Sequence, residues 1–195
     1  MDKIIFQTDA ADETFDFHVG AGESLSMTFI CCSPNPVTNR VTVSLDGPGA
    51  ECTLRGLYVV KGSSTVDFHI KLIHNAPECR SNQLFKGILH DNAIARFDGL
   101  VNVVPGARKT EASQTCHNIL LSPSAKAVAE PQLEIYADDV QCSHGATIGQ
   151  ISEDEMFYLR SRGISEPEAR LLIVEAFAAE ILDTLPPDSN LIFCF

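Results

Sequence analysis

Residues 53–77 read TLRGLYVVKGSSTVDFHIKLIHNAP, and this stretch carries the pattern that decides the fold. Two runs rich in β-branched and aromatic residues, 53–60 and 65–73, are each followed by a short cluster of turn-forming residues. Runs of this kind, bounded by Gly, Ser, Asn and Pro, are typical of β-strands. The stretch therefore predicts a strand, a turn, a second strand and a second turn.

The same pattern extends in both directions along the chain. Further strands are predicted at residues 14–19, 25–31, 40–45 and 94–104, and further turn clusters at 20–22, 46–49, 90–92 and 105–107. The turns recur about every 14 residues or a multiple of that spacing. We therefore expect the chain to be β-rich up to about residue 151.

This rhythm fits two architectures. A β-sandwich is one of them, and a β-helix, in which each coil of chain stacks on the one before, is the other. The strand faces combine small, β-branched and cysteine residues with few large aromatic ones, as in 101–104 and 116–121. That composition favours the narrow interior of a β-helix, although periodicity alone leaves both architectures open.

The pattern becomes helical after residue 151. A serine followed three residues later by a glutamate occurs at Ser152 and again at Ser165, and such capping boxes predict the starts of two helices. The second helix is expected to continue to about Leu185, where two prolines stop it. One apolar stripe is expected along it, made of Leu171, Val174, Phe177 or Ala178, Ile181 and Leu185. We therefore expect a β core at residues 1–151 and a helical domain at 152–195 that is too small to hold its own core.

Composition excludes several classes of protein. The chain has 195 residues, with 26 acidic and 14 basic side chains and a formal net charge of −12, so it lacks the cationic surface that nucleic acids or anionic membranes require. Its most apolar stretch is too short to cross a bilayer. The odd number of cysteines, without any CxxC pair, points to a reducing compartment and a cytoplasmic location; they are Cys31, Cys32, Cys52, Cys79, Cys116, Cys142 and Cys194.

One stretch resembles a known family. Residues 132–149 read QLEIYADDVQCSHGATIG and residues 157–164 read FYLRSRGI, and both are similar to the SufB/SufD family of iron-sulfur cluster assembly proteins. The likeness covers about residues 95–185. Residues 122–131 lack the scaffold cysteine that SufB-like members carry there, so the chain resembles SufD more than SufB. Full-length members are longer, which implies that the β core is truncated at its N-terminus.

The resemblance implies a mainly β fold, a right-handed parallel β-helix core with a small C-terminal α-helical domain. It also implies a non-catalytic subunit of a SufBCD complex, which pairs with a SufB-like paralogue through its β-helix end and binds a SufC-like ABC ATPase through its helical domain. An iron-sulfur cluster or iron would be held transiently in the complex, with no cofactor bound tightly by the isolated chain. Because an open end exposes unpaired strand edges, a homodimer is expected in isolation.

Cys142 and His144 are the candidate metal ligands. They lie two residues apart on a predicted strand, so both side chains leave the same face, and a thiolate and an imidazole suit iron, zinc or copper. A tetrahedral site needs four ligands, which indicates a half-site that a partner chain completes. The resemblance implies that His144 faces the SufB scaffold cysteine. The alternative is a buried cysteine beside a hydrogen-bonded histidine.

The other cysteines suggest structural roles. Cys116 and His117 are adjacent, and adjacent strand residues point to opposite faces, so the pair is not expected to bind one ion. Cys31 and Cys32 have the same limitation, and the isolated cysteines are expected to be small buried or terminal residues.

The resemblance also implies that the exposed face of the helical domain binds the ATPase. The residues of this docking region are Phe157, Tyr158, Arg160, Arg162 and Glu175. Most apolar residues of the helical domain are expected to pack between the two helices and the β core. The sequence contains no phosphate-binding loop of the G-x-x-x-x-G-K-[ST] type, so any ATP hydrolysis must come from another protein.

Two other functions compete with this interpretation. A β-helical carbohydrate-active enzyme would need a row of carboxylates along a groove, and the sequence shows no convincing row. A purely structural interaction domain would leave the cysteines inert. Turnover of sugar polymers would identify the first, and the lack of an iron- or thiol-dependent phenotype would identify the second.

Overall fold

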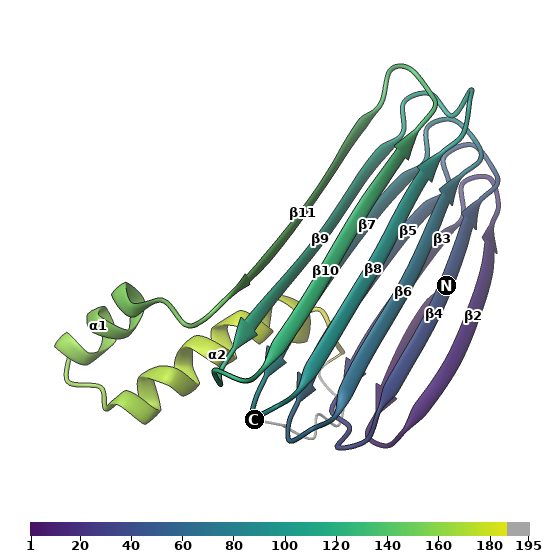
Figure 1. The fold of residues 1–195 in the computed structure, drawn as a ribbon. Helices are drawn as coiled ribbons and strands as arrows, with labels where there is room; N and C mark the ends of the chain where they lie inside the picture. The colour runs from purple at the N-terminus through teal and green to yellow at the C-terminus, as the bar shows by residue number, and fades with distance from the viewer. Residues whose placement is uncertain (187–195) are drawn as a thin grey trace.

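The computed structural model describes residues 1–186, which form a parallel β-solenoid followed by a two-helix hairpin (Figure 1). Residues 187–195, including Cys194, lie outside the described part of the chain. The elements are β1 (Asp2–Gln7), β2 (Ala11–Val19), β3 (Ser24–Cys31), β4 (Val37–Leu45), β5 (Glu51–Val60), β6 (Thr65–His74), β7 (Arg80–Leu89), β8 (Ile94–Val103), β9 (Glu111–Leu120), β10 (Lys126–Ile135), β11 (Gln141–Gly149), α1 (Glu153–Ser161) and α2 (Glu166–Leu182).

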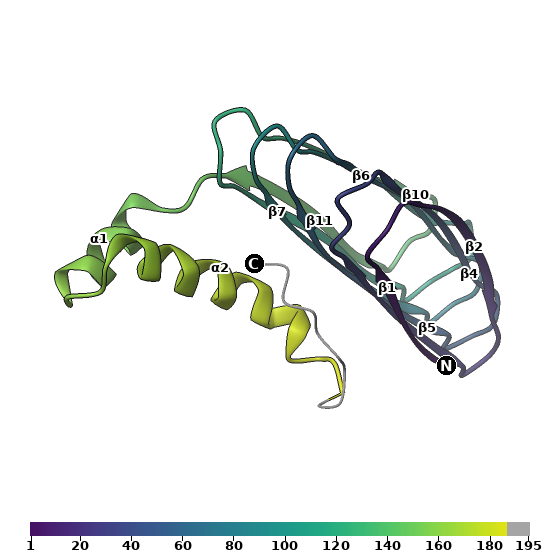
Figure 2. The same cartoon turned by 90° about the horizontal axis from the view of Figure 1, so that it is seen from below.

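Successive strands alternate between two facing sheets. The odd-numbered strands form one sheet in the order β1-β3-β5-β7-β9-β11, which we call sheet A, and the even-numbered strands form sheet B in the order β10-β8-β6-β4-β2. Neighbours within each sheet are parallel, and from β3 onward equivalent positions in sheet A are 27 to 31 residues apart. Each coil of the solenoid therefore contains two strands, which confirms the predicted β-helix and rules out the sandwich (Figure 2).

The turn that enters each strand of sheet A from β3 onward has a left-handed residue two positions before the strand. These residues are Gly22, Gly49, Glu78, Lys109 and Asp139, with φ between 55° and 71°. Hydrogen bonds between coils hold the turns: the N–H of Gly22 donates to Pro48 O at 3.0 Å, and the N–H of Glu78 donates to Arg108 O at 2.8 Å. Because each turn is held by the turn of the next coil, residues other than glycine can occupy the left-handed position.

A ladder of aromatic rings fills the interior of the middle coils. Phe68 is fully buried, and its ring centroid lies 5.5 Å from that of Phe29 and 5.0 Å from that of Phe85, which in turn lies 4.8 Å from Phe97. The expectation of an interior with few large aromatic side chains was therefore wrong, although the fold that it favoured is confirmed. The sequence disperses these four phenylalanines over four strands, so the ladder exists only after the coils stack.

Glycines make room for this ladder. A Cβ at Gly56 would come within 2.4 Å of the Phe85 ring, and a Cβ at Gly87 would come within 2.2 Å of both Tyr58 and Asn118. Gly56 is the register partner of Phe85, and Gly87 is the register partner of Tyr58. A large side chain on one coil thus occupies the space that the glycine of the neighbouring coil leaves empty.

Helix α2 covers the outer face of sheet A at the carboxyl ends of its central strands. Ile30, Leu57 and Ile88 form a buried apolar cluster with three residues of α2, namely Val174, Ala178 and Ile181. This cover explains why β3, β5 and β7 end in runs of consecutive buried residues instead of alternating. The hairpin lies on the opposite side of sheet A from sheet B (Figure 2).

Lys86 of β7 attaches α2 to the sheet. Its side chain is only 7% exposed, its Nζ donates to Phe177 O at 3.0 Å, and it lies 4.6 Å from the centroid of the Phe177 ring. Nζ also pairs with the carboxylate of Glu180. A buried ammonium with these partners is satisfied, so it joins the helix to the strand without an uncompensated charge.

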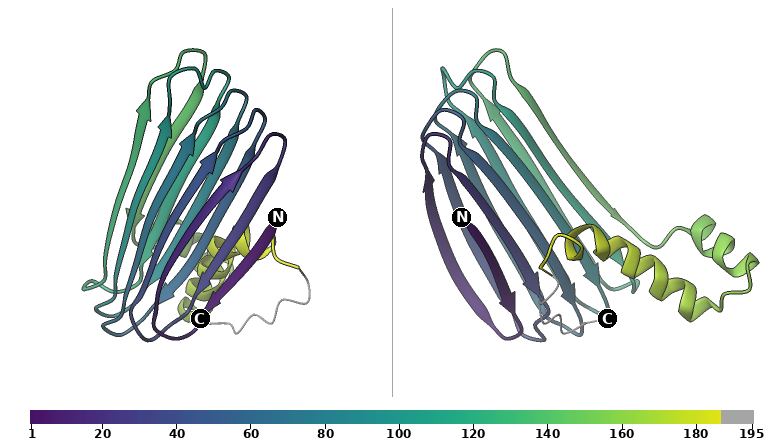
Figure 3. Two further views of the ribbon diagram at one scale, coloured as in Figure 1. Left: turned by 90° about the vertical axis from the view of Figure 1, so that its right-hand side faces the viewer. Right: turned by 180° about the vertical axis from the view of Figure 1, so that it is seen from behind.

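Both helices begin where the sequence predicts. Ser152 accepts a hydrogen bond from the N–H of Glu155, and Ser165 and Glu168 form a complete capping box. Helix α2 ends at Leu182, about one turn before the predicted end at Leu185. The larger difference is in packing. Every residue of α1 is at least partly exposed, because α1 projects beyond the edge of the solenoid (Figure 3).

Candidate functional site at the open end of the solenoid

Cys142 and His144 lie on β11, the last strand of sheet A. Their register partners on β9 are Ala112 and Gln114, both buried inside the solenoid. Residues that pair in register on parallel strands share one face, so Cys142 and His144 both point toward the interior. The shared face is the one that the spacing predicts. Cys142 is half-buried and His144 is exposed, whereas the alternative expected a buried cysteine beside a hydrogen-bonded histidine.

The last coil is open. The inward-facing residues of β10, such as Ala129 and Leu133, are only partly buried, and His144 is exposed. Within the described residues β11 has one hydrogen-bonded neighbour, β9, and β10 has one, β8. His144 therefore faces the inside of the fold and yet remains accessible from the end of the stack.

The side chain of Cys142 is more buried than that of His144. It packs beside Leu133 and Val140 against a small apolar cluster that includes Val103 and Ala112. Burial raises the pKa of its thiol, and a hydrogen bond with the Ala112 backbone opposes that change. A thiol with a raised pKa carries its proton near neutral pH and must lose that proton before it can bind a metal.

A ladder of two buried amides lies directly beneath His144. Gln114 Nε2 donates to Gln83 Oε1 at 3.0 Å, and both side chains are fully buried. Further along β9, the Asn118 amide accepts from Tyr58 OH at 2.7 Å and donates to Cys116 Sγ at 3.4 Å. The interior therefore becomes polar toward its open end, in contrast to the aromatic ladder of the middle coils. The sequence analysis did not identify these amides, because only the stacking of β7 on β9 brings them together.

Four of the other cysteines, and His117, occupy the positions that the sequence predicts. Cys116 is buried in the interior, whereas His117 lies outside, where its Nδ1 is 2.6 Å from Thr147 Oγ1. Cys31, Cys52 and Cys79 are also buried, and burial raises the pKa of each of these thiols. Residues 1–186 contain no group of three or more side chains able to hold a metal ion, so Cys142 and His144 stand as two ligands at most.

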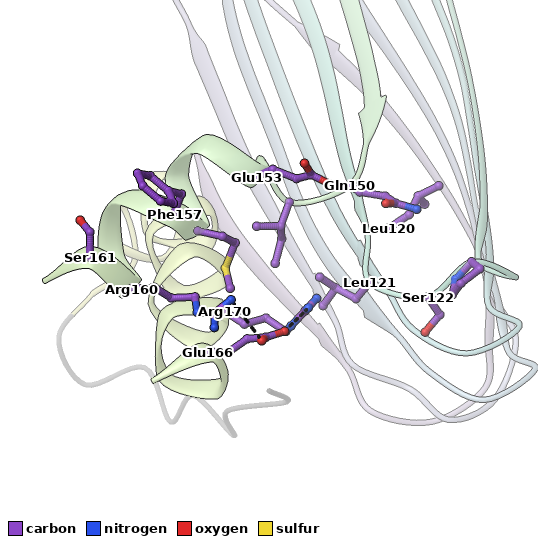
Figure 4. Close-up of a pocket in the computed structure, with 13 residues that line it drawn as sticks. Leu120, Leu121, Ser122, Gln150, Glu153, Phe157, Arg160, Ser161, Glu166 and Arg170 are labelled. Atoms are coloured by element: carbon purple, nitrogen blue, oxygen red, sulfur yellow. Dashed lines mark ion pairs between the residues drawn. The ribbon is translucent and has the colours of Figure 1, made fainter. Parts of the chain in front are cut away.

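The five predicted docking residues of the hairpin are all exposed, but they line different surfaces. Phe157 and Arg160 line a cleft of about 950 Å³ between the hairpin and the end of β9, where Glu166 pairs with both Arg160 and Arg170 (Figure 4). Tyr158 instead borders a mostly apolar groove of about 760 Å³.

The apolar groove lies between α1 and α2. It is lined by Ile119, Asp154, Glu155, Tyr158, Leu159, Leu172, Ile173, Ala176 and Phe177. Arg162 lies 5.2 Å from the centroid of the Tyr158 ring, and Glu175 borders neither hollow.

Several apolar residues of the hairpin are not packed, contrary to expectation. Phe157 is 75% exposed, and Leu171 and Leu172 are 46% and 45% exposed. Leu171 was expected on the packed stripe of α2, and that expectation was wrong. The buried cluster between α2 and the solenoid wall begins at Val174, and before Val174 only Ala169 of the helix is buried, so Leu171 and Leu172 lie outside the packed surface.

The comparisons with known proteins agree with this architecture. Residues 13–177 match the family model described as "SUF system FeS cluster assembly, SufBD core domain". The chain belongs to the SufBD family. In Escherichia coli (strain K12), the iron-sulfur cluster assembly protein SufD is 42% identical over 147 residues, which cover 75% of this chain and 35% of the relative. These matches make the present SufBD chain most similar to SufD.

Two further relatives broaden the comparison. An iron-sulfur cluster assembly SufBD family protein of Synechocystis is 45% identical over 130 residues, covering 67% of this chain and 29% of the relative. The protein ABCI7, chloroplastic, of Arabidopsis thaliana is 38% identical over 149 residues, which cover 76% of this chain and 31% of the relative. This SufBD chain thus spans about a third of the length of the curated relatives it matches. None of the helices within residues 1–186 is long and apolar enough to cross a membrane.

Proposed function

We propose that the chain is a non-catalytic SufD-like subunit of a SufBCD-type iron-sulfur cluster assembly complex. Its open last coil faces a SufB-like paralogue, and its helical hairpin binds a SufC-like ABC ATPase. The observation that carries the proposal is His144, an exposed imidazole that points into the open end of the solenoid. Membership of the SufBD family supports it.

His144, with Cys142 beside it, contributes a half-site for iron or a nascent cluster, which is cargo and not a resident cofactor of this chain. Two ligands hold a transition metal weakly, and four complete a tetrahedral site. The paralogue must then supply the remaining ligands across the interface. Loss of the cargo on separation of the two subunits follows directly from this arrangement.

The apolar groove of the hairpin is the surface proposed to bind the ATPase. Tyr158 and Leu172 line it and are each about half exposed. Contiguous apolar surface of this kind on a polar protein marks an interaction site. The hairpin is joined to β7 through Lys86, so a partner on α2 is connected to β11 through β7 and β9.

A polysaccharide-cleaving enzyme is the less favoured alternative. The outer face of sheet A does have a shallow groove with two carboxylates, Glu51 and Glu111. Both lie within 3.5 Å of the guanidinium of Arg80. Ion pairs with one exposed arginine account for both carboxylates as ordinary surface charges. This groove therefore gives no support to the enzyme.

We place the complex in a reducing compartment. The cytoplasm is the location expected from the sequence, and the relative named as chloroplastic makes an organelle a second location. Fractionation of cells that express a tagged chain distinguishes the two.

The decisive experiment is co-purification with a SufB-like paralogue and a SufC-like ATPase. His144→Ala is expected to keep the paralogue but lose iron from the complex. His117→Ala is the control and is expected to retain iron, because His117 is a half-buried histidine on the outer side of β9. Leu172→Asp is expected to lose only the ATPase. Asp183→Ala is its control, because Asp183 is exposed on the same hairpin, borders neither hollow and is not one of the predicted docking residues. Full iron retention in His144→Ala contradicts the proposed role.

Without the paralogue, the open end is proposed to pair with a second copy of the chain. Strands β10 and β11 each have a free edge in the described structure, and free edges of parallel sheets recruit further strands. Light scattering at high protein concentration is expected to give a dimer that dissociates when the paralogue is added. A monomer at all concentrations contradicts this expectation.

A further inference from the structure

Three interior residues of sheet A form one column that ends at His144. Gln83 on β7 pairs in register with Gln114 on β9, and Gln114 pairs in register with His144 on β11. Gln83 and Gln114 are fully buried, and His144 is exposed. The column therefore leads from the closed interior to the open end through hydrogen-bonding side chains alone.

The amide ladder has a direction. Gln114 Nε2 donates to Gln83 Oε1, so the nitrogen of the Gln114 amide points back toward the preceding coil. Gly99 of sheet B keeps space for that nitrogen, since a Cβ there would come within 2.5 Å of it. The oxygen, Oε1, is the amide atom that this bond leaves unused, and Gln114 is the register partner of His144 on the last coil.

Gln114 Oε1 is a buried acceptor without a donor among residues 1–186. A buried polar atom without a partner costs about 1–3 kcal/mol, so such an atom in a folded protein calls for an explanation. The neighbouring Asn118 shows the contrast, because both ends of its amide are used within the interior. Gln83 Nε2, at the other end of the ladder, also lacks a partner among residues 1–186, so the ladder is incomplete at both ends, and Gln114 is the end next to the candidate site.

We propose that Gln114 is a positioning residue for His144: its Oε1 accepts a hydrogen bond from one ring nitrogen of His144 when a partner covers the last coil. Covering the end removes water from the imidazole, and its N–H then needs an acceptor. A neutral imidazole that donates through one nitrogen presents the other nitrogen bare. The amide ladder thereby fixes which nitrogen of His144 is free for iron.

This inference rests on the proposed function of His144. The buried amides of Gln7 and Asn39, in the first coils, show the contrast, because each donates to the oxygen of the other at 2.9 Å. Ring orientation set by a second hydrogen bond is what makes a histidine a good metal ligand. The opposite arrangement, in which both amides of the ladder are reversed, presents Gln114 Nε2 to the ring. His144 would then accept that bond, and its outer nitrogen would carry the proton and could not bind a metal.

The test uses the complete chain with ¹⁵N-labelled histidine, bound to the unlabelled paralogue. The ring nitrogens of His144 are assigned by comparison with His144→Ala. The expected result is one protonated ring nitrogen whose hydrogen exchanges slowly with water, and one bare nitrogen. In Gln114→Met, a change that keeps the length of the side chain, the slow exchange is lost. Asn118→Leu is the control, because it removes a buried amide from the same strand that pairs with Ile148 instead of His144.

A second readout measures metal binding by the same complexes, with Co²⁺ as the probe. Gln114→Met is expected to weaken binding about ten- to a hundredfold, as loss of a residue that orients a ligand does elsewhere, while Asn118→Leu leaves it within about twofold. Fast exchange of the His144 ring proton in the unaltered complex overturns the proposal, as does a His144 nitrogen that accepts from Gln114.

The two proposals fail separately. If His144→Ala retains Co²⁺ and iron, the proposed function is wrong, whatever the state of the ring. If His144→Ala loses them but Gln114→Met behaves as Asn118→Leu does, the half-site stands and the positioning role is wrong.

Discussion

Two histidines point into this solenoid, one in a closed coil and one at the open end. His74 lies at the end of β6 between Leu45 and Val103 of the neighbouring coils, and it is fully buried. Its Nε2 lies 2.9 Å from Ser81 Oγ, and burial lowers its pKa to about 4. His144 has a neighbour in register on one side only and is exposed.

The difference teaches that stacking, and not residue type or orientation, decides what an inward-facing side chain can do. A residue with a coil on both sides becomes part of the packed core, where a polar group costs energy unless it is bonded. A residue on the last coil keeps the same orientation but remains free to meet a partner. The following predictions test this contrast between closed coils and open end.

The largest effect is expected in the closed coils, from Phe68→Ala. Phe68 contacts the rings of Phe29, Tyr58 and Phe85, and its removal leaves a cavity that neighbouring coils cannot fill. We expect a loss of about 3–5 kcal/mol in the free energy of unfolding, measured by urea denaturation. Phe157→Ala is the control, because Phe157 is 75% exposed and is expected to change stability by less than about 0.5 kcal/mol. Similar losses in both variants would contradict the contrast.

Two glycine substitutions sharpen the comparison. In Gly87→Ala the new Cβ would lie 2.2 Å from the Tyr58 ring, so we expect a loss of about 1–3 kcal/mol in the free energy of unfolding. In Gly145→Ala, on β11, the new Cβ meets no atom within 4 Å in the described chain, and stability is expected to stay within about 0.5 kcal/mol. Urea midpoints of the two variants measure the difference, and equal midpoints would refute it.

The pH dependence of stability reports on His74. The unfolded chain binds a proton on this histidine near pH 6.5, but the folded chain does so only near pH 4. The unfolded state therefore holds more protons between these values, and stability falls as the pH falls through that window. We expect His74 to lower the free energy of unfolding by about 2 kcal/mol between pH 7 and pH 5. His74→Gln is expected to remove this part of the pH dependence, measured by urea denaturation at a series of pH values. An unchanged slope in His74→Gln would place the titration elsewhere.

The smallest effect on stability is expected at the open end. His144→Ala removes an exposed side chain from the last coil and is expected to change the free energy of unfolding by less than about 0.5 kcal/mol. Urea denaturation of the isolated chain measures this change beside the His74 variant. A loss above about 1 kcal/mol would show that His144 belongs to the core and not to an available site.

Much of the fold could be predicted from local pattern. The strands with Gly-rich turns before them, such as β5, were found in place within about two residues. Strand β7 was missed, because the turn before it places Glu78 in the left-handed position where a glycine would have given the signal. Strand β10 was missed as well, since it contains Pro131, which is unusual inside a strand.

The candidate site was only partly predictable for the same reason. The spacing of Cys142 and His144 gave their common face, since that depends on one strand alone. The amides of Gln83 and Gln114 are 31 residues apart in sequence, and neither carries a motif. Their contact depends on the number of residues in one coil, which local pattern does not fix. The exposed Leu171 was misplaced because the stripe on α2 continues beyond the wall that it packs against.

The interior glycines give the solenoid a mechanical character. The ring of Phe85 occupies the space left at Gly56, and Tyr58 crosses over Gly87 to reach Asn118. Neighbouring coils therefore interlock, and one coil cannot slide along its neighbour unless an aromatic ring first leaves the space at the glycine. A stack built in this way is stiff against shear. If α2 is displaced, Lys86 would move β7 with it, and β9 and β11 would move with β7 as one rigid body.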